Sequence, residues 1–211
     1  MAAQIKICGV SSPEAIRASI TAGAEWCGLN FYRPSPRFVS SDIAARLADV
    51  AGTAIRKAGV FVDADDELLS LAVVAGKLDA IQLHGHETPE RAAEVRARFG
   101  LPLWKVLSVE SAEDVVRADL YAQAADFILF DAKTPKGMMP GGMGHQFDWS
   151  LLRLYNGALP WGLAGGLTAA NVADAIRLTG APLVDTSSGV ESAPGIKDVD
   201  KIAAFCKAAR L

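Results

Sequence analysis

The chain has 211 residues and a formal net charge of -3, with 51% hydrophobic and 21% charged residues. This composition is typical of a globular protein with a large core, and the length suits a single domain over residues 1–211. No apolar run reaches the roughly 18 residues of a membrane-spanning helix, and no basic cluster predicts nucleic-acid binding. The N-terminal MAAQIKICGV lacks the pattern of a signal peptide. We therefore expect a cytoplasmic protein without a membrane or nucleic-acid partner.

Short apolar segments alternate with Ala-, Glu- and Arg-rich segments along the chain. The expected strands lie at 5–9, 26–31, 56–62, 79–83, 103–107, 127–130, 160–164 and 182–185. The expected helices lie near 12–22, 41–50, 65–75, 88–98, 111–123, 149–155, 169–178 and 198–209. Thr88, Pro89 and Gly100 illustrate the helix signals, because they suit the N-cap, the first turn and the C-terminal end of one helix.

Strict alternation of strands and helices predicts a parallel sheet covered by helices. Eight such pairs fit either a closed (β/α)₈ barrel or an open, doubly wound sheet that binds a nucleotide. The first strand–helix turn, ICGVSSPEA, carries neither a GxGxxG fingerprint nor a GxxxxGK[ST] loop. We therefore predict the α/β fold class, as a single (β/α)₈ TIM barrel of the phosphate-binding type.

Catalytic groups of such barrels lie at the C-terminal ends of the strands and in the loops that follow. Two of these loops, 32–40 and 132–148, are long and rich in Gly and Pro. The second far exceeds the usual two to six residues of a strand–helix connection, which favours a functional lid over a passive link.

The last two strands are each followed by a candidate phosphate-binding loop. Gly165 and Gly166 precede a helix expected to open near Thr168, and the eighth strand runs into Ser187, Ser188 and Gly189. Glycines let the backbone approach an anion closely, and helix N-termini favour negative charge. Phosphate groups commonly bind at these two places in this fold. The alternative is that both segments are only tight turns.

The first strand carries a candidate nucleophile or base. Side chains alternate along IKIC, so Lys6 and Cys8 share one face, and we expect that face to point into the barrel. A nearby ammonium favours the thiolate form of a cysteine. The alternative is that Cys8 is a small buried apolar group, as we expect for Cys27 and Cys206. An odd number of cysteines without CxxC argues against disulfides, and no His/Cys cluster has metal-ligand spacing.

Other polar residues also follow strands. Asp131 is either a structural anchor for the next loop or a general acid, and Arg37 either clamps a carboxylate or is a solvated loop charge. His84 is more typical of a hydrogen-bonded barrel residue than of a catalyst, and Asp148 suits a helix N-cap. Asp185 ends the eighth strand. A thiol, a carboxylate, a guanidinium and a phosphate cradle together indicate proton transfer on a phosphorylated, anionic substrate.

These residues resemble those of phosphoribosylanthranilate isomerase of tryptophan biosynthesis, and the resemblance covers essentially the whole chain. The matching segments are KICG at 6–9, SPR at 35–37, QLHG at 82–85, D-x-KT at 131–134, GGMGHQFDW at 141–149, LAGGLTAANV at 163–172, and DTSSGVE with PGIKD at 185–198.

The resemblance implies an Amadori rearrangement of N-(5-phosphoribosyl)anthranilate without a cofactor or a metal, by a monomer or homodimer. It implies that Cys8 is the general base that removes the C2 proton, and that Asp131 is the general acid that protonates the furanose oxygen. By the same resemblance Arg37 holds the anthranilate carboxylate and Asp185 contacts the sugar hydroxyls. The phosphate would bind the amides of the glycines and serines after the last two strands.

The chain departs from the family pattern in the loop after the sixth strand. Met143 stands where the family has a hydroxyl residue, and PKGMMP before it is long and rich in Met. Asn30 adds an inward polar group without an assigned role. The remaining alternatives are another phosphate-binding barrel enzyme, such as an epimerase or decarboxylase, and a non-catalytic barrel that binds a sugar phosphate. The former normally needs metal ligands or an Asp/Lys array, and the latter needs no acid and base.

Overall fold

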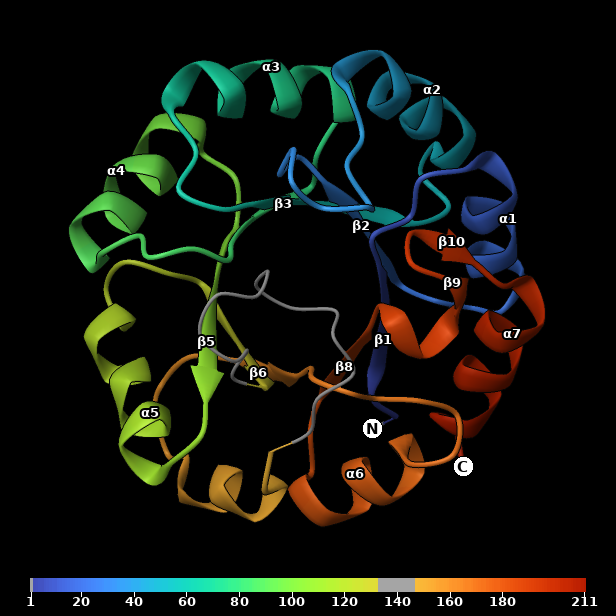
Figure 1. Cartoon of the computed structure of the whole chain (residues 1–211). Coiled ribbons are helices and arrows are strands. Elements are labelled where there is room, and N and C mark those ends of the chain that lie inside the picture. The colour runs from blue at the N-terminus through green and yellow to red at the C-terminus, as the bar shows by residue number, and fades with distance from the viewer. Residues whose placement is uncertain (1, 133–146) are drawn as a thin grey trace.

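A computed structural model describes residues 2–132 and 147–211, in which eight parallel strands close into a barrel inside a ring of helices (Figure 1). The strands pair with their neighbours in chain order, and β1 also pairs with β8, which closes the barrel. The strands are β1 (Gln4–Cys8), β2 (Trp26–Asn30), β3 (Arg56–Phe61), β4 (Ala80–Leu83), β5 (Leu103–Val109), β6 (Phe127–Ala132), β7 (Trp161–Leu163) and β8 (Leu183–Thr186). The prediction of a closed (β/α)₈ barrel is confirmed.

Helices follow the strands and cover the outside of the barrel (Figure 1). The α-helices are α1 (Pro13–Thr21), α2 (Ser41–Ala51), α3 (Asp66–Gly76), α4 (Pro89–Phe99), α5 (Ala112–Val116), α6 (Val172–Thr179) and α7 (Val199–Ala208). The cap signals of α4 hold, because the Thr88 side chain accepts the N–H of Arg91 and Gly100 ends the helix at φ 63°. Among the described residues no helix is long and apolar enough to cross a membrane.

The structure differs from the sequence prediction in several connections. The helix expected at 111–123 is split into α5 and the 3₁₀-helix η1 (Arg117–Tyr121), and the segment expected at 149–155 is the 3₁₀-helix η2 (Trp149–Leu154). Short connectors of this kind often take the tighter 3₁₀ geometry. After β8 the chain forms η3 (Ser188–Val190) and a small hairpin of β9 (Glu191–Ala193) and β10 (Ile196–Lys197). This hairpin was not predicted, although its turn contains Gly195 at φ 83°.

The barrel has an apolar layer outside the strands and a mixed interior. Ile5 and Ile7 are fully buried in the outer layer, so the intervening Lys6 points inward, as predicted. At the N-terminal ends of the strands Trp104 contacts Trp26 and Phe127, with ring centroids 4.7 and 4.6 Å apart. These aromatic side chains fill the N-terminal end of the barrel interior, and the polar interior residues lie toward the C-terminal ends of the strands.

A buried ion pair holds the loops that follow β3 and β4. Lys105 Nζ lies 2.7 Å from Glu87 Oε2, and both side chains are almost fully buried. The Glu87 carboxylate also accepts the backbone N–H groups of Asp63 and Gly85, each at 2.9 Å. The charge of Glu87 is therefore fully hydrogen bonded only while Lys105 is present.

Replacing Lys105 with methionine is expected to lower the free energy of unfolding by about 3–5 kcal/mol, because it leaves the Glu87 charge buried without its partner. A matched control is Lys77→Met, which breaks an ion pair with Asp49 in which both side chains are mostly exposed. This change should cost less than about 1 kcal/mol. Urea unfolding of the two variants measures the difference in unfolding free energy. Equal losses of stability would contradict a stabilising role of the buried Lys105–Glu87 pair.

Candidate active site

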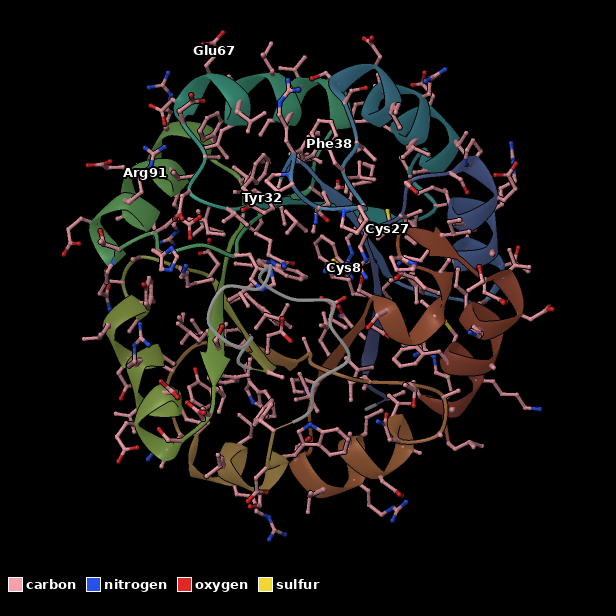
Figure 2. All side chains as sticks on the ribbon, in the orientation of Figure 1. Cys8, Cys27, Tyr32, Phe38, Glu67 and Arg91 are labelled. Atoms are coloured by element: carbon pink, nitrogen blue, oxygen red, sulfur yellow. The ribbon has the colours of Figure 1, made fainter. Side chains whose placement is uncertain are left out.

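A cavity opens among the C-terminal ends of the strands. Its volume is about 740 Å³, counted with the solvent space at its mouth. Eight of the nine predicted site residues line it: Cys8, Arg37, Asp131, Gly165, Gly166, Asp185, Ser187 and Ser188. In Figure 2 Cys8 lies toward the middle of the barrel, whereas Glu67 and Arg91 lie on the outer ring of helices.

Cys8 ends β1 beside two ammonium groups. Burial raises the pKa of the Cys8 thiol, and the charges of Lys6 and Lys197 act in the opposite direction. A side chain on Gly28 of β2 could not be accommodated, since its Cβ would lie 2.8 Å from Cys8 Sγ. Cys8 is partly exposed, while the buried Cys27 and Cys206 have pKa values raised to about 12 and about 11 by burial. Cys8 is therefore the thiol that a ligand in the cavity can reach.

The inward Lys6 is fully buried and paired with Asp185 of β8. Its Nζ lies 2.7 Å from Asp185 Oδ2. Burial lowers the pKa of Lys6, but the neighbouring Asp185 and Cys8 more than compensate and raise it above the ordinary value. The other carboxylate oxygen, Asp185 Oδ1, is buried without a hydrogen-bond partner in the described part of the chain. Because a buried acceptor normally finds a donor, this oxygen is available to a ligand hydroxyl.

Asp131 reaches the cavity from β6. Its Oδ1 accepts the N–H of Ala132 at 2.8 Å, and its Oδ2 lies 3.3 Å from His84 Nε2. The Gly165 backbone packs beside this carboxylate: φ is 89°, and a Cβ there would lie 3.1 Å from Asp131 Oδ1 and 2.5 Å from the Ala132 nitrogen. The imidazole of His84 is thus a direct neighbour of the predicted acid. The sequence analysis expected His84 to be a hydrogen-bonded barrel residue and assigned it no catalytic role.

The two predicted phosphate loops lie side by side. Thr186 Oγ1 donates to the Leu167 carbonyl at 2.8 Å and so joins the segment after β8 to the segment after β7. Gly189 does not line the cavity; its Cβ would lie 2.0 Å from the same carbonyl oxygen, so glycine is needed for the loops to pack. The helix expected to open near Thr168 begins at Val172 instead. It follows a turn in which the Asn171 side-chain oxygen accepts the Thr168 N–H.

Arg37 is buried at the edge of the cavity and already has a carboxylate partner. Its Nε and Nη2 donate to the two oxygens of Glu191, at 2.7 and 2.8 Å. Burial raises the pKa of Glu191, but the hydrogen bonds and charges of Arg37 and Lys197 lower it by more. The pKa therefore lies below its ordinary value. Glu191 is a residue that functional reasoning from the sequence missed, although it stands in the DTSSGVE motif.

Further polar side chains line the cavity beside the predicted ones, namely Asn30, Tyr32, Ser35, Gln82 and Thr186. Among them Asn30 was expected to point inward, and it does. Among the described residues no group of three or more His, Cys, Asp and Glu side chains could hold a metal ion. Residues 133–146, which include Met143 and most of the predicted lid, lie outside the described residues.

Comparison with known proteins gives one consistent result. The family model for N-(5'-phosphoribosyl)anthranilate (PRA) isomerase matches residues 5–208. The N-(5'-phosphoribosyl)anthranilate isomerase of Paramagnetospirillum magneticum is 54% identical over 211 residues, covering 100% of this chain and 98% of the relative.

Solved structures are similar over the same extent. A structure of monomers of the dimeric phosphoribosylanthranilate isomerase from Thermotoga maritima has a TM-score of 0.83 and 34% identity, covering 98% of each chain. A phosphoribosylanthranilate isomerase in complex with reduced 1-(o-carboxyphenylamino)-1-deoxyribulose 5-phosphate has a TM-score of 0.83 and 32% identity, again covering 98% of each chain.

Proposed function

The chain belongs to the N-(5'-phosphoribosyl)anthranilate isomerase family, and on that premise we propose how its own residues carry out the reaction. The protein is an isomerase of tryptophan biosynthesis. It converts N-(5-phosphoribosyl)anthranilate to 1-(2-carboxyphenylamino)-1-deoxyribulose 5-phosphate by an Amadori rearrangement. The observation that carries the residue assignments is the single cavity that Cys8 and Asp131 line from non-adjacent strands.

In the first step Asp131 is the general acid. Its protonated carboxyl donates a proton to the furanose ring oxygen while the C1–O bond breaks. The nitrogen lone pair then forms a C1=N iminium, which acidifies the proton on C2. Enclosure of Asp131 between the Ala132 amide and His84 supports this role, because both contacts fix the direction of the carboxyl group.

In the second step Cys8 is the general base. The thiolate removes the C2 proton, and the electrons of the C–H bond form C1=C2 as the C1=N electrons return to nitrogen. The resulting enolamine becomes the ketone when a proton moves from the C2 hydroxyl to C1. Lys6 and Lys197 favour the thiolate that this step requires.

The remaining assignments concern binding. Backbone N–H groups of Gly165, Gly166, Ser187 and Ser188 hold the phosphate, with Gly189 completing the loop after β8. Asp185 accepts a hydrogen bond from a sugar hydroxyl through its unpartnered Oδ1. Arg37 holds the anthranilate carboxylate. The partner is thus one phosphorylated small molecule with two anionic groups, for which cationic side chains and oriented amides are suited.

We also propose that the protein acts in the cytoplasm, as a monomer or a homodimer. Its three cysteines are free thiols, which is typical of a reducing compartment. The related Thermotoga maritima isomerase is known both as a dimer and as monomers.

Fluorescence of the anthranilate group tests the activity directly. Purified protein is expected to abolish the emission of N-(5-phosphoribosyl)anthranilate at a rate proportional to enzyme concentration. A barrel that only binds the sugar phosphate would bind the reduced product analogue and leave the emission unchanged, which would overturn the assignment.

Substituting Arg37 with alanine is expected to raise KM by about 10- to 100-fold, since a hydrogen bond to a charged group contributes about 1.5–3 kcal/mol. Arg33→Ala is the matched control, because Arg33 lies exposed in the same loop and outside the cavity. Steady-state kinetics of both variants decide the matter. A large loss of kcat in Arg37→Ala with an unchanged KM would contradict the clamp.

A further inference from the structure

Lys197 on β10 is a buried cation, and the proposed reaction scheme assigns it no contact with the substrate. Its side chain is 1% exposed, and its Nζ donates to three acceptors: the Ser187 carbonyl at 2.9 Å, Ser187 Oγ at 3.2 Å and Glu191 Oε1 at 2.8 Å. An ammonium has three N–H donors. All three are therefore committed to the protein, and Lys197 acts on the site through other groups.

These contacts connect three parts of the cavity wall. Ser187, in the proposed phosphate loop, donates through Oγ to the Cys8 carbonyl at 3.1 Å. Glu191 holds both Nε and Nη2 of Arg37. A single ammonium thus links the strand end that carries the base, the loop that holds the phosphate and the arginine that holds the carboxylate. The hairpin of β9 and β10 that brings Lys197 there is an addition to the barrel.

Lys197 also affects the balance of charge around Cys8. On β1 and β8 the Lys6 charge is countered by Asp185. On the hairpin side, two cations, Lys197 and Arg37, share the carboxylate of Glu191, so these three side chains carry one excess positive charge. The other titratable groups that line the cavity with Cys8 are Tyr32 in the loop after β2, His84 directly after β4, and Asp131 of β6.

We infer that Lys197 is a positioning residue that stabilises the thiolate of Cys8 by its charge and fixes Ser187 and Glu191 by its hydrogen bonds. The electrostatic part rests on the proposed role of Cys8 as the base. Burial raises the pKa of the thiol, and Lys197 is one of the two cations that oppose this effect. Burial also lowers the pKa of Lys197, but Glu191 and Cys8 act against this lowering, which is the reciprocal effect expected of an interacting pair.

The variant Lys197→Met tests the electrostatic part without measuring activity. The rate of alkylation by iodoacetamide, followed against pH, reports ionisation of the accessible Cys8, and Cys8→Ser gives the background from buried Cys27 and Cys206. An opposite charge nearby shifts a pKa by about one unit or more. We expect the alkylation midpoint to rise by about one pH unit and the rate at pH 7 to fall by about tenfold. The value of kcat/KM at pH 7 should fall similarly and recover at higher pH.

Two further variants separate charge from packing. Lys197→Gln removes the positive charge but keeps an amide N–H donor, and Glu191 stays paired with Arg37, so no buried carboxylate is left without a cation. The inference requires a raised midpoint in Lys197→Gln as well, and a midpoint near the parent value in Lys197→Arg. Lys201→Met is the matched control: Lys201 is exposed and donates to the Glu191 carbonyl at 2.7 Å, and its loss should leave the midpoint unchanged.

An unchanged midpoint in Lys197→Met would overturn the inference. So would the parent midpoint in Lys197→Gln, because hydrogen bonds without the charge would then suffice and Lys197 would have a purely structural role. Either result is distinct from failure of the proposed function, which would appear as unchanged anthranilate emission with the parent protein. It is also distinct from failure of the base assignment, which would appear as full activity in Cys8→Ala.

Discussion

Replacing Cys8 with alanine is expected to lower kcat by about 10³-fold, with little change in binding of the reduced product analogue. Positioned general bases contribute about 10²–10⁴-fold, and no other described thiol is accessible to the cavity. Stopped or continuous fluorescence assays of purified variant and parent measure the loss. Cys8→Ser should be nearly as inactive, since a serine hydroxyl ionises far less readily than a thiol.

Cys27→Ala is the control for this change. Cys27 lies one strand away on β2, fully buried in the outer apolar layer, where burial raises its pKa to about 12. Its removal should leave kcat unchanged. Full activity of Cys8→Ala would refute its assignment as the base.

The pH dependence of the parent enzyme follows from the same group. Because burial raises the pKa of the Cys8 thiol, the base is protonated at low pH, and kcat/KM should increase as the pH rises through that pKa. A profile that falls over this range would identify a different base.

The fold was predictable because its signals are local. Strand–helix alternation, helix caps such as Thr88 and the lack of a dinucleotide fingerprint in the first turn need only neighbouring residues. The expected inward direction of Lys6 and Cys8 likewise followed from alternation along one strand. The hairpin of β9 and β10 escaped prediction because its strands have only three and two residues, too few for a periodic pattern.

The partners of the site residues could not be predicted, because they are distant in the chain. Lys6 and Asp185 are 179 positions apart, and Arg37 and Glu191 are 154 apart. Barrel closure alone brings β1 beside β8, and no local pattern encodes which carboxylate meets which cation. Gly189 illustrates the same limit: it was expected to line the cavity, yet the Leu167 carbonyl beside it explains why glycine is required.

Asp131→Asn is expected to lower kcat by about 10²–10³-fold through loss of the proton donor. The substitution preserves size, and the asparagine amide oxygen can accept the Ala132 N–H in place of the carboxylate Oδ1, so the fold and affinity for the reduced product analogue should survive. The carboxamide has no acidic proton to give to the furanose oxygen, and ring opening should become rate-limiting. Single-turnover fluorescence of the variant measures this step.

A matched carboxylate separates acid catalysis from a structural effect. Asp148 caps the N-terminus of η2, where its exposed side chain accepts the N–H of Ser150 at 2.9 Å. Asp148→Asn makes the same chemical change outside the cavity and should leave kcat nearly unchanged. If Asp131→Asn instead kept kcat and lost affinity for the product analogue, Asp131 would be a binding residue. The ring-opening proton would then have to come from another group. The neighbouring candidate is His84, whose Nε2 lies 3.3 Å from Asp131 Oδ2.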